Sequence, residues 1–247
     1  MGVCLLWRPC DKAIMKRITS LLFILAMSLP FLSQAAQFAQ SPRFGSSPKP
    51  KKVLLLKPQM IVAELSAGGV VQRMDDWSQQ ASDNLLQATN QYAHDKALFE
   101  PIPAPEMSLQ ESDWVESHLG LYDRVAGAVF QFGQNSGPDA WAHRRQAWEY
   151  TLGDGLKMLS DQTGAEAALI FVGADYISTG GRKAAFFAGL LVGVAIPLGQ
   201  SFVSAGLVDL KTGDVEWMSF DSSATLDSRD PKAVQSLIKD LFEKYPK

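Results

Sequence analysis

The chain has 247 residues, a formal net charge of −3, 47% hydrophobic residues and 20% charged residues. This length is sufficient for one large domain with a buried core. The composition excludes wholesale disorder, a collagen-like repeat and a long coiled coil. The slight acidic excess lacks the basic signature of a nucleic-acid-binding protein, so we predict no nucleic-acid partner.

The amino terminus has the pattern of an export signal. Met15-Lys16-Arg17 is a short basic stretch, and the 15 residues of 18–32 carry no charge. Ser33-Gln34-Ala35 follows, with small residues at the two positions that favour cleavage before Ala36. A helix that spans a membrane needs about 20 apolar residues. The sequence therefore predicts a cleaved signal peptide over residues 1–35 rather than an uncleaved membrane anchor.

The stretch before Met15 is unusual in front of such a signal, and we interpret Met15 as the true start. Both cysteines, Cys4 and Cys10, lie upstream of it. The mature chain, residues 36–247, then has no cysteine for a disulfide, a thiol nucleophile, a thiolate metal site or lipid attachment. Residues 1–35 carry a net charge of +3, so the mature charge is −6. We expect a periplasmic or secreted protein that is not lipidated.

The first half of the mature chain alternates between strand and helix patterns. Residues 36–52 are rich in Ser, Pro and Lys, which is typical of a flexible, solvated tether. Residues 53–56 form an apolar run that predicts a buried strand. An apolar stripe at three- and four-residue spacing predicts a helix over 75–94. A strand follows at 98–102, where Pro101 restricts it to an edge or an end.

Two more helices and a strand are predicted in the middle of the chain. Ser108 and Glu111 have the spacing of a capping box, which predicts a helix over about 108–132. Gly137-Pro138-Asp139 begins a second amphipathic pattern that reaches 159 and predicts another helix. The apolar run 167–172 predicts a second buried strand.

The carboxyl-terminal part predicts a β-hairpin and a last helix. Residues 202–210 and 215–221 flank a turn that contains glycine. Asp230 and Pro231 have the types expected at the amino end of a helix. The fold class is therefore α/β: a single domain over 53–247, with a mixed sheet of about five strands flanked by helices, and a β-hairpin followed by a terminal helix.

Two stretches of the second half carry a family pattern. Thr163-Gly164-Ala165-Glu166-Ala167-Ala168-Leu169-Ile170 leads from a helix end into a strand, and Gly173-Ala174-Asp175-Tyr176 follows. Residues 205–217, AGLVDLKTGDVEW, read as strand, turn and strand ending in Trp. The pattern resembles the α/β domain of curli-secretion-channel lipoproteins and of lipoprotein activators of penicillin-binding proteins. The resemblance implies an α/β fold and an envelope location, although this chain lacks the lipidated cysteine and has an extra helix around 108–132.

No catalytic or metal-binding pattern assembles in the sequence. The Gly-x-Ser-x-Gly, Walker and Gly-x-Gly-x-x-Gly motifs are absent. The three histidines, His94, His118 and His143, do not have metal-ligand spacing. We therefore predict no catalytic residue, no metal and no cofactor.

The most unusual segment is 184–199, sixteen residues without a polar side chain, directly after the basic turn 179–183. Three interpretations stay open: a buried element of the core, an interface with a partner or a second subunit in which Gly189 and Gly193 let helices approach closely, or a membrane contact. Gly180-Gly181-Arg182 could also form a backbone nest for an anion. The candidate interaction residues are Gly180, Gly181, Arg182, Lys183, Gly189, Gly193 and Pro197.

These observations favour a non-enzymatic exported protein that acts as an accessory or assembly factor of the cell envelope through protein–protein contact. Its partner would be an envelope protein or a second copy of the chain. A second hypothesis is an oligomeric, membrane-associated secretion component built around 184–199. A third is a hydrolase whose catalytic residues are spread over the fold.

Overall fold

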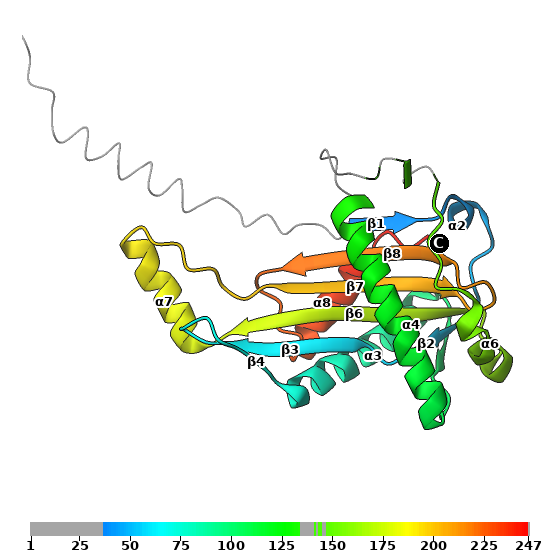
Figure 1. Cartoon of the computed structure of the whole chain (residues 1–247), viewed down its shortest axis with the longest axis horizontal. Helices are drawn as coiled ribbons and strands as arrows, with labels where there is room; N and C mark the ends of the chain where they lie inside the picture. Colours follow the sequence, from blue (N-terminus) through cyan, green and yellow to red (C-terminus); the bar gives the residue numbers. More distant parts are fainter. Residues whose placement is uncertain (1–36, 134–140, 142, 145–146, 247) are drawn as a thin grey trace, which may run out of the picture. The chain divides into compact units, whose positions relative to one another are not determined.

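The computed structural model describes residues 37–133, 141, 143–144 and 147–246, and these residues form a mixed α/β fold built on one sheet (Figure 1). The predicted fold class is therefore confirmed. The sheet has eight strands in place of the five expected. They are β1 (Gln37–Gln40), β2 (Lys52–Leu55), β3 (Gln59–Leu65), β4 (Val71–Arg73), β5 (Glu100–Pro103), β6 (Ala167–Ser178), β7 (Ser201–Asp209) and β8 (Val215–Ser223).

The long strand β6 organises the sheet. It pairs antiparallel with β7, which forms the predicted hairpin with β8, and β1 pairs antiparallel with β8 at the edge. On its other side β6 pairs in parallel with two consecutive strands, first β2 and then β3. Beyond them lie β5, parallel to β2, and β4, antiparallel to β3. The predicted edge position of the strand that contains Pro101 is confirmed.

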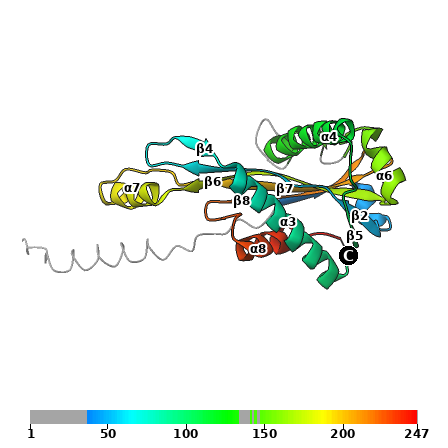
Figure 2. The ribbon, with the colours of Figure 1, turned by 90° about the horizontal axis from the view of Figure 1, so that it is seen from below.

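Helices cover both faces of the sheet (Figure 2). One face carries α2 (Pro42–Ser46), α3 (Asp75–Lys96) and α8 (Pro231–Leu241), and the other carries α4 (Leu109–Ala128) with the π-helix Val129–Gly133, and α6 (Lys157–Thr163). Each layer has its own apolar core, because side chains alternate between the two faces of a strand. Leu55 and Leu169 lie in the first core, and Leu54 and Ile170 lie in the second.

The predicted helix ends are confirmed at three places. Ser108 and Glu111 form a reciprocal capping box at the start of α4. Asp230 caps α8 by accepting from the amide of Lys232, with Pro231 in the first turn. Asp75 and its neighbour occupy the first turn of α3, where negative charge complements the helix dipole.

The predicted tether over 36–52 is wrong for residues 37–46, which form a strand and a short helix. Residues 37–40 form β1, and Ser41 caps the short helix α2 by accepting from the amide of Phe44 at 3.0 Å. Phe44 is buried, with its ring 5.8 Å from that of Tyr245 in an edge-to-face contact. One aromatic anchor and one strand pairing thus hold a segment whose average composition is that of a linker.

The helix predicted over 137–159 is interrupted: His143 and Arg144 are helical, but residues 147–153 are not. Thr151 forms an isolated bridge with Asp214, and helix resumes with a 3-10 turn at Asp154–Leu156 followed by α6. Gly153 explains the break, because its φ of +73° is incompatible with an α-helix. The predicted start of this helix at 137–139 and the signal peptide 1–35 lie outside the described residues.

Candidate functional site

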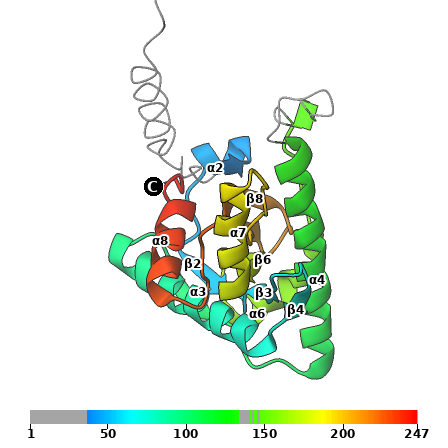
Figure 3. The ribbon, with the colours of Figure 1, turned by 90° about the vertical axis from the view of Figure 1, so that its left-hand side faces the viewer.

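The candidate interaction segment forms an arm at one end of the sheet. It consists of α7 (Gly180–Leu191), which follows the end of β6, and the segment 192–199, which returns to β7. We refer to residues 180–199 as the arm. Figures 1 and 3 show α7 beyond the end of the sheet, at the same end as the turn between β3 and β4.

The arm exposes its apolar side chains to solvent. The exposed fractions are 66% for Phe187, 55% for Leu190, 88% for Leu191, 75% for Val192 and 53% for Val194. The interpretation of 184–199 as a buried core element is therefore wrong. No helix in the described part of the chain is long and apolar enough to cross a membrane.

Polar contacts fix the base of the arm. Thr179 caps α7 by accepting from the amide of Arg182 at 3.1 Å. The buried Arg182 guanidinium donates from Nε to the carbonyl oxygen of Pro197 at 2.8 Å, and from Nη1 to that of Ser66 at 3.1 Å. The amide of Gly199 donates to the Ser178 hydroxyl at 2.8 Å. Both ends of the arm and the β3–β4 turn are thus joined at one place.

The glycines of the arm shape the arm itself. The carbonyl oxygen of Gly189 accepts from the amide of Val194 at 2.8 Å, and a Cβ on Gly189 would lie 2.6 Å from the Val194 carbonyl oxygen. Gly193 lies in the turn with a φ of +75°, and a Cβ there would touch nothing. Gly189 thus allows the close turn of the arm and Gly193 its positive φ, and close approach of a partner at these two glycines stays a prediction.

The remaining candidate residues occupy the base of the arm. Gly180 and Gly181 begin α7, and Lys183 is exposed in its first turn. Pro197 contributes its carbonyl oxygen to the contact with Arg182. The structure gives the Arg182 side chain a structural role, and anion binding by the amides of Gly180 and Gly181 stays a prediction.

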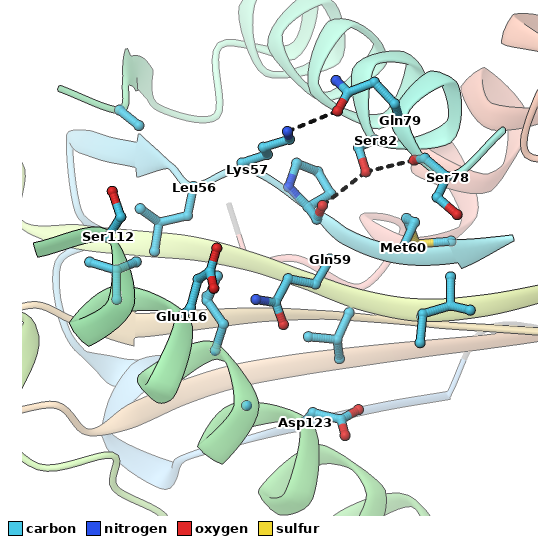
Figure 4. A pocket seen from close by; sticks show the side chains of 18 of the residues that line it. Leu56, Lys57, Gln59, Met60, Ser78, Gln79, Ser82, Ser112, Glu116 and Asp123 are labelled. Carbon is cyan, nitrogen blue, oxygen red and sulfur yellow. Dashed lines mark hydrogen bonds between the residues drawn. The ribbon is translucent and has the colours of Figure 1, made fainter. Parts of the chain in front are cut away.

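A groove of about 960 Å³ lies at the other notable surface, where β2 ends and β3 begins (Figure 4). At this point β5 has ended and β4 has not begun, so residues 56–61 have no neighbouring strand on their outer side. The side chains of α3 and α4, which lie on opposite faces of the sheet, form the two walls. Apolar residues of the groove include Leu56, Met60, Ile61, Val115, Leu119 and Val172.

Serine hydroxyls from α3 bind two backbone groups of the open strand edge. The amide of Val62 donates to Ser78 Oγ at 2.9 Å, and Ser82 Oγ donates to the carbonyl oxygen of Pro58 at 2.9 Å. Residues two apart in a strand direct their backbone groups to the same side. Between these two positions, Met60 therefore points its backbone N–H and C=O toward the groove.

The rim of the groove carries charges of both signs. Lys57 donates to Gln79 at 2.8 Å, and Arg124 is exposed on α4. Glu116 and Asp123, also on α4, form no ion pair within the described residues. No described residue that lines the groove is a histidine or a cysteine. The described residues contain no group of three or more His, Cys, Asp or Glu side chains that could hold a metal.

Sequence reasoning missed this groove because its parts are far apart in the chain. Residues 56–61, α3 and α4 meet only through the parallel pairing of β2 and β3 with β6. The one local signal was Lys57-Pro58 after the apolar run, since proline interrupts a strand by removing an amide donor.

No known protein-family profile matches the chain, and no curated protein sequence matches it. Among solved structures, the PelC dodecamer from Paraburkholderia phytofirmans is 14% identical, with a TM-score of 0.36, over 84% of this chain and 93% of PelC. The lipoprotein GNA1162 from Neisseria meningitidis is 12% identical, with a TM-score of 0.33, over 79% of this chain and 99% of GNA1162. The likeness is distant and assigns no function to this chain.

Proposed function

We propose that the chain is a non-enzymatic exported protein that works as an accessory or assembly factor of the cell envelope, and that the arm is its contact surface. The observation that carries this proposal is the exposure of Phe187, Leu190 and Leu191 on a helix that the polar contacts of Arg182 hold in place. A contiguous exposed apolar patch of this kind marks an interaction site.

The fixed base of the arm supports a binding role over simple disorder of an apolar loop. A surface that is already ordered loses less conformational entropy when it binds. Arg182 is buried although it is charged, and its donors are directed at backbone carbonyl groups that hold the arm. These contacts present the apolar side chains in one arrangement before any partner arrives.

Site-specific photo-cross-linking in cells tests the proposal. A photoreactive residue in place of Leu191, with 88% of the residue exposed, is expected to form a discrete protein adduct. The same residue in place of Asp161, exposed on α6, is the control and is expected to form none. Absence of any adduct at position 191, or equal adducts at both positions, would contradict a contact role for the arm.

Membrane association is the second candidate, and the apolar character of the arm favours it. A 12-residue helix is about 18 Å long, shorter than the hydrocarbon core of a bilayer, which is about 30 Å thick. The arm could therefore enter one leaflet without crossing the membrane. If the photoreactive residue at position 191 formed adducts mainly with lipid, this candidate would be favoured over a protein partner.

A further inference from the structure

We infer that the arm of one copy of the chain docks into the groove of a second copy, in a head-to-tail arrangement. This inference rests on the proposed function, because it names the partner of the same arm. The two surfaces belong to one chain but lie apart: the groove is at residues 56–61, whereas the arm starts beyond Leu65, whose carbonyl oxygen accepts from the amide of Thr179. The arm projects away from the sheet, so a groove that it fills belongs to another copy (Figure 1).

The first argument is apolar complementarity. The outer side of α7 exposes Phe187, Leu190 and Leu191, and the return segment exposes Val192 and Val194. An arm with apolar side chains on both α7 and its return segment fits a groove with two walls better than it fits a flat surface. The groove is lined by Ile61, which is 45% exposed, and by Met60 and Leu119, which are 5% and 4% exposed, over a volume of about 960 Å³.

The second argument concerns backbone groups of the return segment. The amides of Ala195, Ile196 and Leu198 donate no hydrogen bond within the described residues. In the hydrocarbon of a bilayer an unsatisfied amide costs several kcal/mol, so irregular segments do not insert there unprotected. The groove has polar acceptors at its rim, including the side chains of Gln59 and Glu116. Because the groove can accept hydrogen bonds from these amides and hydrocarbon cannot, a protein groove is the better binding site for the arm.

The third argument is charge. The carboxyl end of a helix carries partial negative charge on its last carbonyl groups. The tip of the arm is such an end, and the exposed Lys57 and Arg124 on the groove rim are cations that could face it. The arm has only one exposed charged side chain, Lys183 at its base, so it brings no negative side chain that would leave a buried acid in the groove.

Light-scattering mass of residues 36–247 tests the inference with two variants and two matched controls. Leu191→Asp changes the arm, and Leu109→Asp is its control because Leu109 is equally exposed, at 86%, and does not line the groove. Gly120→Trp fills the groove, since a Cβ at Gly120 meets nothing within 4 Å. Gly127→Trp is its control, on the same helix, with equally open space and outside the groove.

We expect the wild type and both controls to assemble beyond the monomer, and each test variant alone to lose about tenfold or more in association constant. Mixing the two test variants is the decisive step. Leu191→Asp keeps an intact groove and Gly120→Trp keeps an intact arm, so the mixture is expected to form a one-to-one dimer and nothing larger. Thermal unfolding of each variant confirms that it is folded.

Three results of the mass measurement would overturn the inference. The wild type could stay monomeric at high concentration, Gly120→Trp could assemble like the wild type, or the mixture could fail to pair. Arm-dependent co-sedimentation of the wild type with phospholipid vesicles, lost in Leu191→Asp, would assign the arm to lipid and also overturn it. A monomeric wild type with a protein adduct of another mass at position 191 in cells would refute self-docking and leave the proposed function intact.

Discussion

Arg182 is the residue on which the arrangement of the arm depends. Its guanidinium donates to the carbonyl oxygens of Pro197 and Ser66, and it is almost fully buried. Replacing it with methionine keeps much of the apolar stem but leaves both acceptors without these donors. The loss of a buried hydrogen-bond partner costs about 1–3 kcal/mol. We expect Arg182→Met to reduce amide-exchange protection in residues 180–199.

Hydrogen-exchange mass spectrometry measures this effect directly. Lys183→Met is the control. Lys183 is exposed, so this substitution removes a neighbouring positive charge and leaves the donors to both carbonyl groups in place. Protection of the β6–β7 pairing should be the same in both variants. If exchange in residues 180–199 were as slow in Arg182→Met as in the wild type, the guanidinium would not hold the arm.

Asp221 gives a pH-dependent prediction at the same scale. Burial, reinforced by the negative charge of Asp240, raises the pKa of Asp221 from 3.8 to about 6. The folded state therefore holds this proton more tightly than the unfolded state, so the contribution of Asp221 to stability is greatest below pH 4, declines between about pH 4 and 6, and is level above. Asp221→Asn removes this decline. Because the carboxyl is partly exposed, we expect a gain of about 1 kcal/mol near neutral pH.

Thermal unfolding at two pH values checks the sign of the effect. A gain of about 1 kcal/mol corresponds to roughly 2–4 °C in Tm for a chain of this size. The variant and the wild type should melt at the same temperature below pH 4, where the wild-type carboxyl is also neutral. A Tm gain that is equal at both pH values would point to a cause other than ionisation.

At the scale of elements, β1 and α2 test whether the segment before β2 belongs to the fold. Phe44 is 1% exposed and contacts Tyr245. Truncation of a buried phenylalanine to alanine costs about 3–5 kcal/mol. In urea unfolding we expect Phe44→Ala to lower the free energy of unfolding by this amount, and with it the midpoint. Arg43 is an exposed neighbour, and we expect Arg43→Ala to leave both unchanged. A neutral Phe44→Ala would restore the flexible tether that composition predicts.

The same scale shows what sequence patterns can and cannot supply. Local signals placed the caps at Ser108 and Asp230 and the β7–β8 hairpin, because short-range hydrogen bonds determine them. They missed β4, whose three residues are all exposed and have no apolar periodicity. They also extended a helix through residues 148–153, where the bridge between Thr151 and Asp214 gives the chain a different course.

At the scale of the whole molecule, the sequence indicated one of the two notable surfaces, the arm, and did not indicate the groove. The apolar segment 184–199 was visible as a run without polar side chains, but its exposure depends on where β6 ends and β7 begins. The groove had no sequence signal beyond Pro58. Its walls come from α3 and α4, which are far apart in the chain and lie near each other only where the pairing of β2 with β6 ends. Periodicity reports which side chains are apolar, whereas topology decides what covers them.

The central claim is that a partner covers the arm in the cell, and thiol labelling measures this most directly. With Cys4 and Cys10 replaced by serine the chain has no cysteine, so Leu191→Cys and the control Asp161→Cys each provide a single reactive thiol in that background. We predict that maleimide labels Leu191→Cys about tenfold more slowly in intact cells than in dilute purified protein, while Asp161→Cys reacts at the same rate in both. Equally fast labelling of Leu191→Cys in both settings would contradict the account.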